Sequence, residues 1–134
     1  MEVINIKGTE HTPRVVFDHN SNKFEIRGDS RPENARQFYE PLIKWLDDYN
    51  KYIYWIKEQG HAVNSIDFIF NLEYFNSTSA KFLLDIFLQL KEFNKESDLF
   101  KVKWHYDEMD TDMKESGEEF ELMVEMKFEY IINS

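Results

Sequence analysis

The sequence predicts a two-layer α/β domain in which a mixed β-sheet carries two main helices, packed mostly on one face. Several segments alternate apolar and polar residues, which indicates strands, and two longer segments repeat apolar residues every three or four positions, which indicates helices. The alternating segments keep one mostly polar face, whereas strands covered by helices on both faces would be apolar throughout. A chain of 134 residues is expected to form one domain, spanning residues 1–134.

The first part of the chain is predicted to form three strands. Residues 1–8 place Ile4 and Ile6 on one face of a first strand. Residues 14–17 and 23–27 flank the turn-rich sequence DHNSN and are typical of the two strands of a hairpin.

A long helix is expected to follow. Ser30 and Glu33 have the spacing of a capping box, and Pro32 would then lie in the first helical turn. Apolar residues recur along one helical face at Phe38, Leu42, Trp45, Tyr49, Tyr52 and Ile56. Pro41 lies within this pattern and predicts a kink, or a short helical turn before the main helix.

The second half of the chain alternates between strand and helix patterns. Strands are predicted over residues 66–74 and 100–106, with a helix over residues 82–93 between them. This order predicts a right-handed crossover that joins two parallel strands. The acidic segment 110–123 is expected to be partly helical, and the alternation over residues 124–132 predicts a last strand.

Composition limits the classes of partner. The formal net charge of -10 argues against binding to nucleic acid or to an anionic membrane surface, because both would repel the chain. The absence of cysteine excludes disulfides and thiolate chemistry. The first residues do not form a signal peptide, and no run approaches the roughly 18 apolar residues of a membrane helix. We therefore expect a cytoplasmic protein whose partners are other proteins, with no nucleic acid and no membrane among them.

No motif of catalysis or metal binding is present. The sequence lacks a nucleophile elbow, a Walker loop and a dinucleotide-binding glycine motif. A calcium loop that starts at Asp110 fails, because Lys114 occupies a ligand position and Glu115 replaces the required glycine. The four histidines form no pair at helical spacing. We expect a protein that is not an enzyme and has no catalytic residues, metal site or cofactor.

A hydroxyl cluster, Asn76-Ser77-Thr78-Ser79, lies between a predicted strand and a predicted helix. One of these hydroxyls could cap the helix and add about 1 kcal/mol of stability. Three exceed what a cap needs, and the alternative is a phospho-acceptor, whose roughly -1.5 to -2 charges would lie beside the positive end of the helix dipole. Lys81 could hold such a phosphate or contact a kinase, although exposed helical lysines are common. The residues alone leave these interpretations open.

Five motifs in this order resemble the SiaC family of bacterial regulatory phosphoproteins. They are TPRVVFD at residues 12–18, GDSRPEN at residues 28–34, FYEPLIKWLDDY at residues 38–49, FNSTSAKFLLDIF at residues 75–87 and VKWHYDEMDTDMKESGEEF at residues 102–120. The resemblance implies a fold similar to anti-sigma-factor-antagonist (STAS-like) domains. In such domains a phosphorylatable Ser or Thr lies between a strand and a helix, just after an Asp or Asn.

Carried over residue by residue, Asn76 matches the residue before the acceptor and Ser77 matches the acceptor, with Thr78 as the second choice. The resemblance also implies three partners: a Ser/Thr protein kinase, a PP2C-type phosphatase and an effector such as a diguanylate cyclase. We expect Asn76, Ser79 and Lys81 to contact a partner at the same corner. The leading hypothesis is a phospho-switch protein of a partner-switching pathway. The alternative is a constitutive protein-binding scaffold in which the cluster only caps a helix.

Overall fold

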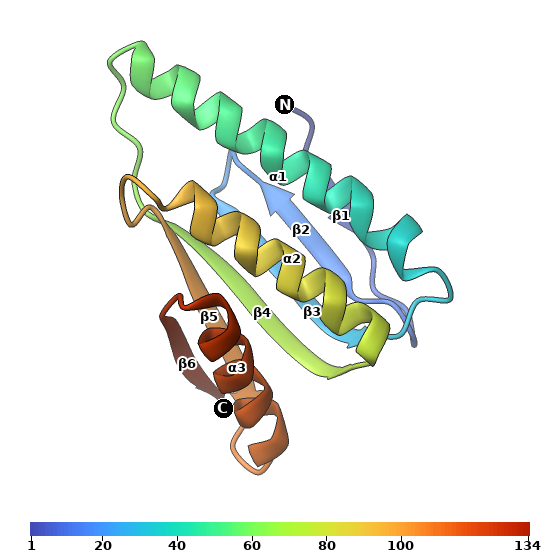
Figure 1. Cartoon of the computed structure of the whole chain (residues 1–134). Helices are drawn as coiled ribbons and strands as arrows, with labels where there is room; N and C mark the ends of the chain where they lie inside the picture. The colour runs from blue at the N-terminus through green and yellow to red at the C-terminus, as the bar shows by residue number, and fades with distance from the viewer.

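The strands of the structure lie side by side in the order in which they occur in the chain. A computed structural model describes residues 1–134 (Figure 1). Its strands are β1 (Ile4–Ile6), β2 (Arg14–Asp18), β3 (Lys23–Ser30), β4 (Ile66–Phe75), β5 (Phe100–Asp107) and β6 (Phe128–Asn133). Its helices are α1 (Ala35–Glu58), α2 (Ser77–Phe93) and α3 (Thr111–Val124).

The sheet is mixed, as predicted. The first three strands pair antiparallel, and β3 to β6 are parallel, each joined to the next by one helix. Crossovers of one hand that always advance in the same direction must put their helices on the same face of the sheet. All three helices accordingly cover one face in Figure 1. The prediction of helices on one side is confirmed, and α3 adds a third helix to the two expected.

The core lies between this helical layer and the inward face of the strands. Aromatic rings fill it: Phe24 stacks on Phe68 at 4.7 Å between ring centroids, and Trp104 lies 6.3 Å from Phe70 in a second stacked pair. These four side chains are almost completely buried. Burial of side chains this large is the main favourable term that holds the helices on the sheet.

The predicted start of the long helix is wrong. Asn34, not Ser30, caps α1, and its Oδ1 accepts a hydrogen bond from the Gln37 N–H at 3.0 Å. Ser30 is instead the last residue of β3 and is fully buried. The strand reaches Ser30 because its register against β4 shifts at Gly28, whose φ of 110° is a conformation that favours glycine. Pro41 lies inside one continuous helix.

The C-terminal boundary also differs from the prediction. The acidic segment is helical to Val124, so the last strand begins four residues later than expected, at Phe128. Met113, Gly117, Phe120 and Val124 form the buried side of α3 at helical spacing. Glu125 then ends the helix in the left-handed conformation, with φ 58°.

Candidate functional site

The corner between β4 and α2, residues 76–81, is the site that the sequence singles out. Asn76 is the N-cap of α2: its side-chain oxygen accepts a hydrogen bond from the Ser79 N–H at 2.9 Å. No hydroxyl of the cluster therefore caps the helix, and that interpretation is wrong. The Asn76 N–H donates to the Ser30 carbonyl at 3.1 Å, which ties this corner to the end of β3.

Ser77 and Thr78 are the exposed hydroxyls of the corner. They are the first two residues of α2, and both side chains face solvent. The first backbone N–H groups of a helix have no partner within it. At this corner the N–H groups of Asn76 and Ser79 are satisfied elsewhere, so those of Ser77 and Thr78 remain without a partner. Two free donors thus lie directly beside the two exposed hydroxyls.

Ser79 differs from its neighbours because it is fully buried. Its hydroxyl donates to the Ser30 carbonyl at 3.0 Å and accepts from the Ser30 hydroxyl at 2.8 Å. The Ser30 hydroxyl also lies 2.6 Å from the Tyr39 hydroxyl, and burial raises the pKa of Tyr39 to about 12. The expectation that Ser79 contacts a partner therefore does not fit its position, since no surface of the side chain is free.

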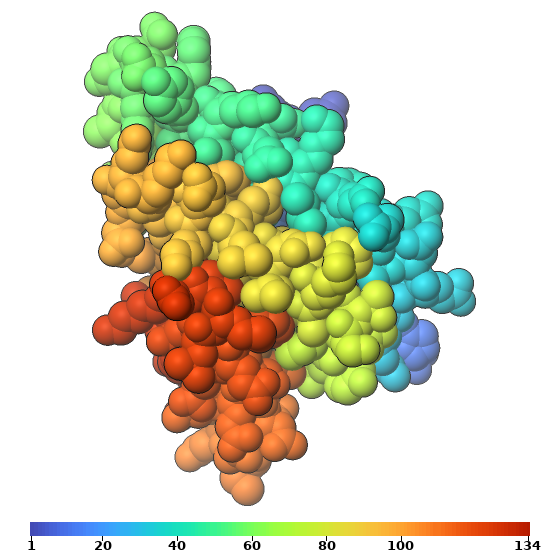
Figure 2. All heavy atoms as spheres, in the orientation of Figure 1, coloured from blue at the N-terminus to red at the C-terminus, as the bar shows by residue number.

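Two cations, Lys81 and Arg36, lie near the corner, and Arg36 pairs with Glu40 at 2.7 Å. Lys81 lies four residues after Ser77, on the same side of α2, and pairs with Asp85 at 3.7 Å. The cationic groups of Lys81 and Arg36 lie 4.5 and 5.8 Å from the centre of the Phe82 ring. In Figure 2 the yellow-green start of α2 is at the surface beside the cyan start of α1. An anion at this corner would lie beside the positive end of the α2 dipole and within reach of these two cations.

Comparisons with known proteins show which family this chain belongs to. Residues 6–133 match the family model described as SiaC family regulatory phosphoprotein. The chain belongs to the SiaC family. An uncharacterised protein of Pseudomonas aeruginosa (strain UCBPP-PA14) is 28% identical over 120 residues, which are 90% of this chain and 88% of the relative.

Two solved structures of this family extend the likeness to the fold. Apo-SiaC from Pseudomonas aeruginosa is 25% identical, with a TM-score of 0.78 over 100% of both chains. A chain in the crystal structure of the diguanylate cyclase SiaD in complex with its activator SiaC, from the same species, is 26% identical. Its TM-score is 0.79 over 96% of this chain and 97% of that chain. The mixed α/β architecture is thus that of SiaC.

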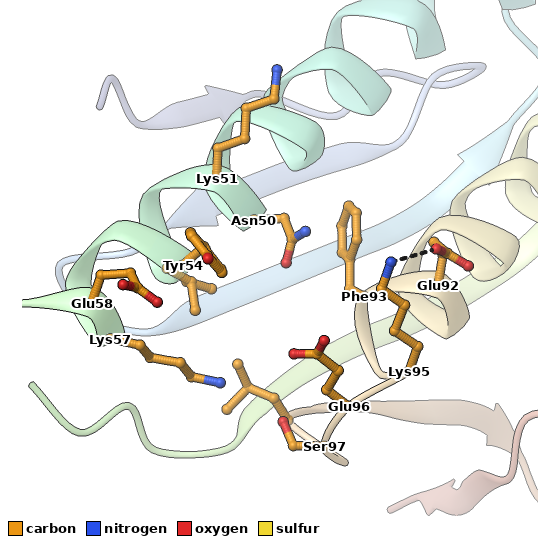
Figure 3. A pocket seen from close by; sticks show the side chains of 12 residues that line it. Asn50, Lys51, Tyr54, Lys57, Glu58, Glu92, Phe93, Lys95, Glu96 and Ser97 are labelled. Carbon is orange, nitrogen blue, oxygen red and sulfur yellow. Dashed lines mark hydrogen bonds and ion pairs between the residues drawn. The ribbon is translucent and has the colours of Figure 1, made fainter. Parts of the chain in front are cut away.

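A second surface feature of this SiaC-family chain lies at the opposite end of the helical layer. A groove of about 730 Å³ separates the last turns of α1 and α2, and Figure 3 shows its lining. Tyr54 and Phe93 line it together with lysine and glutamate side chains. One hydrogen bond joins two lining side chains, from Lys95 to Glu92 at 3.1 Å.

The structure also bears on metal binding and on membrane spans. No group of three or more His, Asp or Glu side chains is arranged to hold a metal ion. None of the three helices has both the length and the apolar character needed to cross a membrane.

Tyr39 and Arg36 were not predicted to belong to the site, and Ser30 was wrongly predicted to cap a helix. The GDSRPEN motif was the available signal, but its serine resembles a helix cap until the register of β3 is known. Tyr39 has the spacing of an ordinary core residue, and nothing in the local pattern links it to a hydroxyl cluster that starts 37 positions later.

Proposed function

We propose that this chain is a non-enzymatic phospho-switch protein that binds an effector through the corner at residues 76–81. Phosphorylation of Ser77, with Thr78 as the second choice, releases that effector. The observation that carries the proposal is the pair of exposed hydroxyls beside two unpaired backbone N–H groups. A kinase can reach these hydroxyls without unfolding the helix, and the helix can accommodate the product.

The charge change explains the release. A phosphate adds roughly -1.5 to -2 charges and three strong acceptor oxygens. The free N–H groups of Ser77 and Thr78, the helix dipole and Lys81 stabilise that charge within the chain. A partner docked on the same corner loses access to these donors and meets the new charge next to exposed Glu73. Like charges brought together at an interface weaken binding strongly.

The partners follow from the chemistry and from the family. A reversible switch needs a Ser/Thr protein kinase and a phosphatase, which we propose to be of the PP2C type. Membership of a family of regulatory phosphoproteins supports both. The complex of SiaC with the cyclase that it activates supports a diguanylate cyclase as the effector. Because the kinase consumes ATP and a cyclase consumes GTP, we place the switch in the cytoplasm.

The alternative is a constitutive scaffold in which the cluster only shapes the start of α2. Asn76 already provides the cap, so the hydroxyls of Ser77 and Thr78 are not needed for it. The structure therefore removes the main structural reason for keeping two exposed hydroxyls here. A binding experiment can distinguish the scaffold from the switch.

Binding of the effector by Ser77 variants tests the switch. We expect Ser77→Ala to bind a diguanylate cyclase whose gene lies near the gene of this chain. Ser77→Asp should bind that cyclase with an affinity lower by about tenfold or more, because the added charge opposes docking. Calorimetry or surface plasmon resonance measures the ratio. Ser97→Asp is the matched control, since Ser97 is an exposed serine in the distant groove.

Two further outcomes decide between the candidates. Equal affinities for Ser77→Ala, Ser77→Asp and the control would favour the scaffold. Peptide mapping locates the phosphate after incubation with ATP and a Ser/Thr kinase that is encoded by a neighbouring gene. Phosphate found only outside Ser77 and Thr78 would overturn the site.

A further inference from the structure

A chain of three buried hydroxyls links the phosphorylation corner to the two elements beside it. Ser79 belongs to α2, Ser30 to the end of β3 and Tyr39 to α1. All three residues are 0% exposed. Buried hydroxyls without partners are unfavourable, and apolar residues of similar shape would fill this space at no such risk. All three hydroxyls have partners here, so they form a directional contact as well as filling space.

The direction of each hydrogen bond follows from the number of protons. Each hydroxyl has one proton to donate. Ser79 donates its proton to the Ser30 carbonyl, and Ser30 donates its own to the Ser79 oxygen. Tyr39 is therefore the donor in its 2.6 Å contact with the Ser30 hydroxyl. The chain of hydrogen bonds runs from Tyr39 through Ser30 to Ser79 and is complete.

This chain fixes the rotation of the first turn of α2 about the helix axis. The Ser30 carbonyl accepts both the Ser79 hydroxyl and the Asn76 N–H, so the turn is held at two points. Successive residues of an α-helix are about 100° apart around its axis. With Ser79 directed into the core, Thr78 projects sideways, and Ser77 projects about 160° away from the buried direction.

We propose that Tyr39 and Ser30 are positioning residues that act through Ser79 to present Ser77, rather than Thr78, for phosphorylation. The inference rests on the proposed function, because it concerns which hydroxyl of that same site is modified. It also fits Lys81, which lies within about 40° of Ser77 around the helix and so faces the same way.

The test compares two tyrosine variants that each lose one hydrogen-bonded hydroxyl. Tyr39→Phe removes the donor to Ser30 and keeps the ring, which stacks on Phe82 at 5.8 Å. Tyr130→Phe is the matched control, because it removes the 2.6 Å bond to Glu121 at the α3–β6 side of the molecule. Both proteins, and the wild type, are incubated with ATP and the neighbouring kinase, and peptide mapping gives the ratio of Ser77 to Thr78 phosphate.

We expect the ratio to fall about threefold or more in Tyr39→Phe and to stay at the wild-type value in Tyr130→Phe, because small displacements of a reacting group have large effects on rate. Hydrogen exchange read at the amides of Ser79 and Ala80, which bond to Asn76, should quicken about fivefold in Tyr39→Phe alone.

The remaining outcomes overturn the inference in different ways. Faster exchange with an unchanged ratio would show that the hydroxyl chain only stabilises the fold. Equal phosphate ratios and equal exchange rates in the two variants would show that the Tyr39 hydroxyl has no specific effect on the first turn of α2. Absence of phosphate from the wild-type corner would overturn the proposed function itself, and the positioning role with it.

Discussion

Four consecutive polar residues at the start of α2 have three different kinds of surroundings. Asn76 caps the helix, Ser77 and Thr78 face solvent, and Ser79 is buried against Ser30. Their side chains are chemically similar, so only the rotation of the helix separates their roles. At the scale of single residues, the buried contact between Ser79 and Ser30 sets which hydroxyl of the cluster is structural and leaves the other two exposed.

Gly117 offers a prediction at the same scale. A Cβ at this position would lie 2.6 Å from Nε1 of Trp104, and that nitrogen donates to the Met113 carbonyl at 2.9 Å. The ring cannot move away without breaking this bond. Alanine usually stabilises a helix relative to glycine by roughly 0.5–1 kcal/mol. Here we expect Gly117→Ala to lower the free energy of unfolding by about 1–3 kcal/mol, because it overpacks the core.

Urea unfolding measures this change, with Glu119→Ala as the control. Glu119 is exposed on the same helix, so its replacement should change stability by less than about 0.5 kcal/mol. A stabilised Gly117→Ala protein would show that α3 lies farther from Trp104 than the structure has it.

At the scale of elements, α1 and α2 begin in the same way. Each follows a strand of the parallel half of the sheet, and each is capped by an asparagine whose Oδ1 accepts from the N–H three residues on. The sequence predicted a serine cap for α1, which is wrong, and left a hydroxyl cap open for α2, where the cap is Asn76. Asparagine and serine are nearly equal as caps, so local sequence cannot rank them when both are present.

The two caps give a matched pair of variants. We expect Asn76→Ala and Asn34→Ala each to lower the free energy of unfolding by about 1 kcal/mol, because each loses one cap hydrogen bond. Thr78→Ala should change it by less than about 0.5 kcal/mol, since the Thr78 side chain is exposed and caps nothing. Chemical unfolding of the three proteins measures these differences. A larger loss for Thr78→Ala than for Asn76→Ala would contradict the assigned cap.

At the scale of the whole molecule, topology brings the site together. Because β3 and β4 are parallel, their carboxyl ends lie at the same end of the sheet, and the helices that follow them start there. In Figure 1 the first turns of α1 and α2 lie at one end of the helical layer. Ser30, at the end of β3, pairs with Phe75, at the end of β4. This pairing is what places Ser30 under the first turn of α2.

The buried tyrosines of this layer predict how stability depends on pH. Burial raises the pKa of Tyr39, and of Tyr49 beside Tyr52, to about 12. In the unfolded chain a tyrosine loses its proton near pH 10. Between these values the folded state keeps a proton that the unfolded state has lost, so raising the pH favours unfolding.

We expect the free energy of unfolding to fall between pH 10 and pH 12 by about 1.4 kcal/mol per pH unit for each such tyrosine. Urea titrations across this range measure the slope. In Tyr39→Phe the slope should be shallower by about 1.4 kcal/mol per pH unit. Comparison with the wild type isolates the contribution of Tyr39, because lysines and other groups titrate in both proteins. An unchanged slope would show that Tyr39 ionises normally in the folded protein.

The sequence by itself determined the fold class, the order of strands and helices, the polar outer face of the sheet and the family, because each depends on local periodicity or on a run of adjacent residues. It also reduced the site to a short cluster with two candidate acceptors. Only the tertiary structure decided that Asn76 caps α2, that Ser79 is buried and that Ser30 belongs to β3. The physical reason is that the roles of Ser30 and Ser79 depend on hydrogen bonds between residues 49 positions apart, which no local pattern encodes. The Asn76 cap is a local bond, but asparagine and serine are nearly equal as caps, so the sequence could not choose between them.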